Sequence, residues 1–138
     1  MLSTKIYKNV HGLAEQLLRA AQEEDVATFD TLYEALKTLC LEHESSEKNH
    51  PVQWETLADF TEDTDEALVI YKKALGFAED ESAHDYVASI NYSMAMMLKE
   101  CGENAQALVA AQQAHEVIGN IGDTHLKQDI DDLIDDLQ

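Results

Sequence analysis

Apolar side chains recur at steps of three or four residues along most of this chain, which places them on one face of an α-helix. In residues 5–22 the apolar positions are Ile6, Val10, Leu13, Leu17 and Ala21. In residues 26–41 they are Val26, Phe29, Tyr33, Leu36 and Cys40. Because only EED, residues 23–25, separates the two stretches, they predict two antiparallel helices that form a first hairpin over residues 5–42.

A second hairpin is predicted over residues 51–78. It follows the polar break HESSEKNHP, and Pro51 suits the first turn of a helix, where its missing N–H is harmless. The inward positions of this short helix are Trp54, Leu57, Ala58 and Phe60. After a turn at TEDTD, residues 61–65, we expect Asp63 to cap the next helix, whose apolar positions are Ala67, Leu68, Tyr71, Ala74, Leu75 and Ala78.

A third hairpin is predicted over residues 83–119. Ser82, with Asp85 three residues later, has the spacing of a helix cap, and Gly102 suits the left-handed position that ends a helix. Helix 104–118 follows. The last helix, residues 124–137, has one apolar face, made of Leu126, Ile130, Leu133, Ile134 and Leu137. We expect residues 123–138 to cap the array by covering the exposed face of the third hairpin.

Two triplets with the same steps of four and three residues recur in the second helices of two hairpins, and small residues stand at both ends of each. The sets are Ala67–Tyr71–Ala74 and Ala107–Ala111–Ala114, and residues 88–121 add Met94, Ala95, Leu98 and Gly102. This pattern resembles the tetratricopeptide repeat family, with Ala111 in the family's aromatic place and Asn91 where Trp is common. The resemblance implies an all-α fold of about three stacked hairpins with a capping helix, in one domain over residues 1–138. An irregular helical bundle with an alanine-rich core is the alternative.

The formal net charge of −19 bears on partners. A polyanion repels phosphate backbones and anionic membrane surfaces, so we expect no nucleic-acid and no membrane ligand. It favours basic proteins or peptides, although acidity also serves solubility alone. Cys40 and Cys101 lie far apart and outside any CxxC pair, and we find no signal peptide or apolar span, so we expect reduced thiols and a cytoplasmic location.

Residues with catalytic or metal-binding chemistry are few and scattered. His43, Glu44, Glu47 and His50 cluster in the polar break, without the convergent spacing of a metal site. Asp129, Asp132 and Asp136 lack the glycine and the closing glutamate of a calcium loop. The chain has no phosphate-binding glycine loop and no GxSxG motif. We therefore expect neither an enzyme nor a cofactor.

The family resemblance implies a concave face, formed by the first helix of each hairpin, that grips a peptide. Ser89, Tyr92, Met96 and Lys99 occupy that face in helix 83–101. Tyr92 and Met96 lie one turn apart, off the main apolar stripe, and suit an adaptable groove. They suit equally well burial against a neighbouring helix.

These observations predict a small cytoplasmic adaptor that binds a protein or peptide segment. Two other hypotheses remain. One is an acidic chaperone similar to the tetratricopeptide-type secretion chaperones of bacteria. The other is a structural homodimer that buries Tyr92 and Met96 in its own interface.

Overall fold

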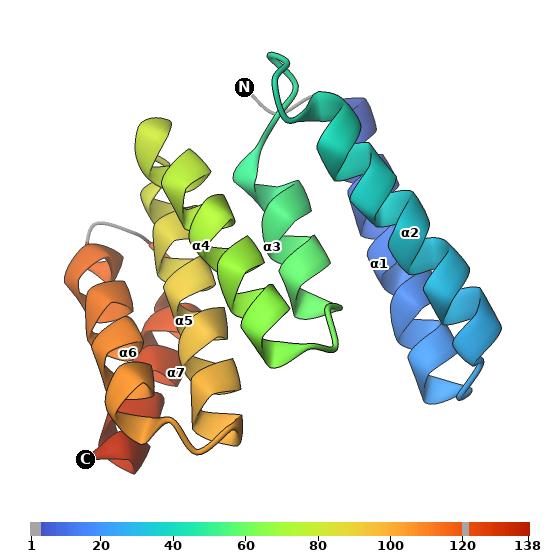
Figure 1. Cartoon of the computed structure of the whole chain (residues 1–138). Coiled ribbons are helices and arrows are strands. Elements are labelled where there is room, and N and C mark those ends of the chain that lie inside the picture. Colours follow the sequence, from blue (N-terminus) through green and yellow to red (C-terminus); the bar gives the residue numbers. More distant parts are fainter. Residues whose placement is uncertain (1–3, 120–121) are drawn as a thin grey trace. The chain divides into compact units, whose positions relative to one another are not determined.

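A computed structural model describes residues 4–119 and 122–138, and every regular element in those residues is an α-helix (Figure 1). The helices are α1 (Thr4–Gln22), α2 (Val26–His43), α3 (Pro51–Asp59), α4 (Thr64–Asp80), α5 (His84–Glu100), α6 (Asn104–Ile118) and α7 (Thr124–Leu137). The all-α prediction is confirmed, and the predicted bounds of α6 and α7 match the observed ones.

The chain forms two compact units, Met1–Ile70 and Tyr71–Gln138, which we call the N-terminal and the C-terminal unit. The boundary lies inside α4. In the N-terminal unit, α1 packs against α2 as the predicted first hairpin, and α3 packs against both. In the C-terminal unit, α5 pairs with α6, and α7 packs against both. Stacking of the hairpins into one superhelical domain stays a prediction.

Large side chains fill the core of the N-terminal unit. Those least exposed come from all three helices and include Ile6, Val10, Leu17, Leu36, Cys40, Trp54 and Leu57. Two apolar positions of the predicted stripe behave differently. Ala21 is exposed, and Val26 is 69% exposed, because they lie near the end of α1 and at the start of α2, beside the turn that joins the two helices. The stripe was correct for the middle of each helix and wrong at these ends.

Alanines recur in the core of the C-terminal unit, beside larger side chains such as Ile90 and Leu98. Six alanines of α5 and α6 are almost fully buried, namely Ala88, Ala95, Ala107, Ala110, Ala111 and Ala114. Ala88, Ala114 and Ile118 form one cluster with Ile130 of α7. In this cluster Ala114 lies against α7, and α7 packs its apolar face on the α5–α6 hairpin.

Three of the turns between helices have the same backbone geometry. Glu24, Ser82 and Gly102 have φ values of 57°, 53° and 80°, in the left-handed region. In each turn the left-handed residue donates its N–H to the carbonyl three residues earlier, and the next residue donates to the carbonyl five residues earlier. This is the Schellman pattern, which satisfies the last carbonyls of a helix. The left-handed Gly102 is confirmed.

The prediction that Ser82 caps α5 is wrong. Its left-handed conformation belongs to the turn that ends α4, where its N–H donates to the carbonyl of Glu79 at 3.0 Å. The cap position of α5 falls to Ala83, which has no side chain able to accept a hydrogen bond. The predicted cap at Asp63 is confirmed, because its Oδ1 accepts from the N–H of Glu66 at 2.9 Å.

Candidate functional site

Two adjoining clefts open on the N-terminal unit, where the α1–α2 turn, α2 and the α3–α4 turn meet. The first, which we call the aromatic cleft, has a volume of about 210 Å³ and is lined by Phe29, Asp30, Tyr33, Phe60, Thr61, Glu62, Asp63 and Glu66. The second, the turn cleft, has a volume of about 410 Å³ and is lined by Ala20, Ala21, Glu24, Asp25, Val26, Phe29 and Glu62. Phe29 and Glu62 line both clefts.

The aromatic cleft has a fixed floor. The rings of Phe29 and Phe60 meet edge to face, with centroids 6.3 Å apart and an angle of 63° between their planes. The hydroxyls of Tyr33 and Thr61 are 2.7 Å apart, and Thr61 Oγ1 also donates to the carbonyl of Leu57 at 2.7 Å. Because a hydroxyl has one proton, Tyr33 must be the donor to Thr61. The three rings are half-buried, so each is held in place while part of it faces solvent.

The rim of the two clefts is acidic. Six carboxylates line them, those of Glu24, Asp25, Asp30, Glu62, Asp63 and Glu66, and no Lys, Arg or His is among the lining residues. Asp25 caps α2, and hydrogen bonding with the side chain of Thr28 and then with its backbone N–H, which lies 3.2 Å from Asp25 Oδ1, lowers the pKa of the Asp25 carboxyl. Asp63 caps α4. The clefts therefore combine aromatic and aliphatic surface with concentrated negative charge.

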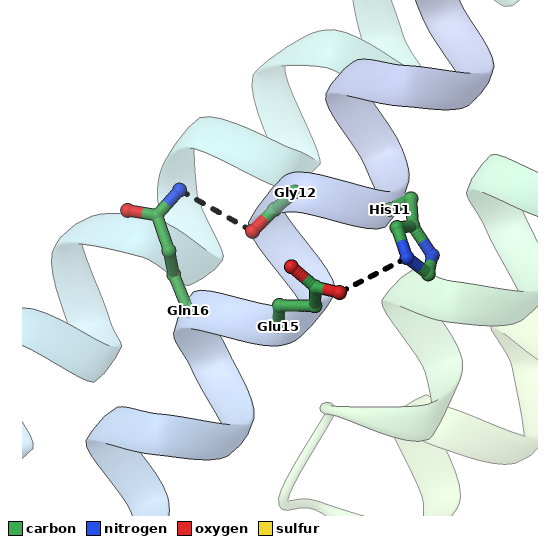
Figure 2. A network of polar contacts seen from close by, with 4 residues as sticks. All are labelled: His11, Gly12, Glu15 and Gln16. Carbon is green, nitrogen blue, oxygen red and sulfur yellow. Dashed lines mark hydrogen bonds and ion pairs between the residues drawn. The ribbon is translucent and has the colours of Figure 1, made fainter.

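A third hollow lies between α1 and α2, with a volume of about 420 Å³. Its charged lining residues, Lys8 and Glu42, have opposite signs. Close to it, α1 satisfies its own polar groups: Gln16 Nε2 donates to the carbonyl of Gly12 at 3.3 Å, and His11 Nε2 lies 3.1 Å from Glu15 Oε1 (Figure 2). This hollow has neither the aromatic floor nor the one-sided charge of the other two.

The four predicted peptide-binding residues, Ser89, Tyr92, Met96 and Lys99, lie half-buried on α5. Two of them contact α7. Tyr92 packs against the cluster that contains Ile130, and its pKa is raised by burial and then by the charges of Asp129 and Asp132. Lys99 Nζ lies 3.4 Å from Asp136 Oδ2. A peptide on this face would share it with α7, and peptide binding there stays a prediction.

The two histidines of the polar break lie at helix ends. His43 is the last residue of α2, and His50 caps α3 by accepting the Val52 N–H on Nδ1 at 3.2 Å. On α7, Asp136 pairs with Lys99, and Asp132 accepts a hydrogen bond from Gln128. Within residues 4–119 and 122–138, no three His, Cys, Asp or Glu side chains are grouped so that they could hold a metal ion.

The two clefts were not predicted from the sequence, although a signal was present. Ala21 ends one apolar stripe and Val26 begins the next, both side chains are exposed, and the acidic residues EED lie between them. Two apolar stripes that end on either side of an acidic turn could have indicated that apolar surface stays exposed there. The meeting of Phe29 with Phe60, 31 positions later, depends on how α3 packs on α2.

Comparison with known proteins finds no match: no family model fits the chain, and no curated protein or solved structure is significantly similar to it. Among the helices that the structure describes, none is long and apolar enough to cross a bilayer. Any functional inference must therefore come from the chemistry of the surface.

Proposed function

We propose that this protein is a non-catalytic, cytoplasmic adaptor that binds a segment of a partner protein in the aromatic and turn clefts. The observation that carries the proposal is the floor of Phe29, Tyr33 and Phe60, fixed by packing and by the Tyr33–Thr61 hydrogen bond yet open to solvent. Aromatic side chains that are already ordered lose little entropy on binding, which is why they are enriched at protein interfaces. The aromatic lining of this cleft therefore offers an ordered surface on which a partner segment can bind.

The repeated turns support a tetratricopeptide-like stacking of hairpins as the architecture of this adaptor. Three turns of one geometry, at Glu24, Ser82 and Gly102, give the pairs α1–α2, α4–α5 and α5–α6 the same local connection. In such an array α7 would be the terminal cap. The second candidate surface is the predicted concave face of α5, with Ser89, Tyr92, Met96 and Lys99, and a ligand there would compete with α7.

A comparison of three crosslinker positions tests this proposal. A photoreactive amino acid replaces Val26 at the turn cleft, Met96 on α5, or Val109 on α6, and the cells that naturally express the protein are irradiated. Val109 is a matched control, because it is 54% exposed and Val26 is 69% exposed. We expect a discrete adduct with one partner from position 26 and none from position 109.

Other outcomes redirect the proposal. An adduct from position 96 alone would move the site to the α5 face. An adduct of the protein with itself would favour the homodimer, and adducts with many unfolded clients would favour a chaperone. Equal labelling at positions 26 and 109 would contradict a specific site at the clefts.

A further inference from the structure

We propose that the segment bound in the two clefts carries an arginine beside an apolar residue, with the guanidinium in the aromatic cleft and the apolar side chain in the turn cleft. This inference rests on the proposed function, because it names the chemistry of the segment that the clefts bind. It assigns one kind of occupant to each of the two volumes, about 210 Å³ and about 410 Å³.

The chemistry of the aromatic cleft selects a cation. Its walls hold three aromatic rings and four carboxylates, those of Asp30, Glu62, Asp63 and Glu66, without a basic residue among them. Aromatic faces attract cations, and carboxylates pair with them, so both parts of the lining favour the same ligand charge. The volume of about 210 Å³ lies below the range of whole-ligand pockets and suits a single side chain.

Arginine fits this lining better than lysine. Its guanidinium is planar, so it can stack on a ring while its N–H groups donate to a carboxylate at the edge. Here Phe29 and Phe60 stand edge to face, and Glu62 belongs to the lining of the same cleft. The carboxylates come from α2, the α3–α4 turn and α4, and no three acidic side chains of the described residues are grouped to hold a metal ion. An extended organic cation therefore suits the site.

The turn cleft supplies the neighbouring subsite. Ala20, Ala21 and Val26 give it an aliphatic surface, and Val26 is 69% exposed at the start of α2. Because Phe29 and Glu62 line both clefts, the two ligand side chains must come from positions close together in the bound segment. The net charge of −19 also attracts a basic segment from a distance.

The test uses the full chain and a displayed library of random peptides as the probe. We expect the selected peptides to be enriched in arginine next to an aliphatic or aromatic residue. In fluorescence anisotropy, replacing that arginine by glutamine should weaken binding about tenfold or more, and replacing it by lysine should weaken it less. Binding should weaken as salt increases, because the rim charges are exposed to solvent.

Protein variants locate the binding. Asp30→Asn/Glu62→Gln removes two rim charges and should weaken the selected peptides about tenfold. The control Glu100→Gln/Asp135→Asn changes the net charge equally at exposed positions of the C-terminal unit and should leave binding unchanged. Val26→Ser removes exposed apolar surface of the turn cleft, should weaken binding, and should leave the unfolding midpoint unchanged.

The outcomes separate the inference from the proposed function. Peptides that lose affinity in Val26→Ser but show no arginine enrichment and no effect of Asp30→Asn/Glu62→Gln would overturn the arginine assignment and keep the clefts as the site. Peptides that bind every variant equally, or a library without any bound peptide, would overturn both. Equal weakening by the control pair would reduce the charge effect to overall attraction and also overturn the assignment.

Discussion

The two units are built alike and packed differently. Each has a helical hairpin with a third helix against it, α3 on α1–α2 and α7 on α5–α6. Alanines let α5 and α6 contact each other more extensively than α1 and α2 do, where leucines such as Leu17 and Leu36 fill the interface. The clefts described above all belong to the N-terminal unit. Side-chain size at a helix interface therefore influences how closely the two helices of a hairpin approach each other.

The largest effect is expected from removing volume in the N-terminal unit. Leu17→Ala should lower the free energy of unfolding by about 2–5 kcal/mol, because Leu17 is fully buried and the surrounding helices cannot close the cavity. Trp54 is the single tryptophan and lies in this unit, so its fluorescence during urea unfolding reports on it. The neighbouring control Leu18→Ala, at a position 52% exposed, should change little. Equal midpoints for the two variants would contradict the described packing.

Adding volume is the corresponding change in the C-terminal unit. Ala107→Leu should lower the free energy of unfolding by about 1–3 kcal/mol, because Ala107 is fully buried on the hairpin helix α6. The control Ala105→Leu adds the same side chain at an exposed position two residues earlier. Circular dichroism during thermal unfolding should show a lower midpoint for Ala107→Leu alone. An unchanged midpoint would mean that α5 and α6 are not in close contact.

Substitutions at two equivalent turn positions should change the free energy of unfolding in opposite directions. Gly102→Ala should cost about 1 kcal/mol, because φ at Gly102 is 80° and an L-residue is strained there. An added Cβ would meet no atom within 4 Å, so the cost comes from the backbone alone. Glu24→Gly in the N-terminal unit, at φ 57°, should relieve the same strain and raise the unfolding midpoint. Urea unfolding measures both, and a loss of stability in Glu24→Gly would break the equivalence.

The smallest effect is expected at Tyr92, at high pH. Its pKa is raised by burial and by Asp129 and Asp132, so the folded C-terminal unit disfavours the phenolate. This contribution to stability is fully present below the unfolded pKa of about 10 and is lost as the pH rises through the folded value. Tyr92→Phe should flatten the alkaline fall of the urea midpoint, measured by circular dichroism. Tyr7→Phe, at an exposed position of α1, is the control, and an identical alkaline curve for both variants would contradict the burial of Tyr92.

Most of the local structure could be predicted from the sequence because its signals are local. Pro51 begins α3, Asp63 caps α4 and Gly102 takes the left-handed turn, each by the conformational preference of one residue. The prediction for Ser82 failed because a serine fits two roles, the cap of one helix and the turn after another. The end of α4 at Asp80 determined that Ser82 forms the turn.

The candidate site depended on contacts between distant segments. A stripe that begins at Val26 predicts burial, but that side chain is 69% exposed and lines the turn cleft together with Glu62 of the α3–α4 turn. Tyr92 presented two equal alternatives, and the structure places it against α7. In both cases the apolar periodicity shows which face of its own helix a side chain lies on. It does not identify the segment that packs against that face.

The sequence by itself determined the helices of the described residues and most of the residues that form their apolar faces, because periodicity, caps and turns act over a few residues. Tertiary structure alone decided which apolar positions stay open, since that depends on where one helix ends against another. The meeting of Phe29, Tyr33 and Phe60 beneath an acidic rim is of this second kind. Helix propensity is a property of neighbours along the chain, whereas a cleft is a property of segments brought together by packing.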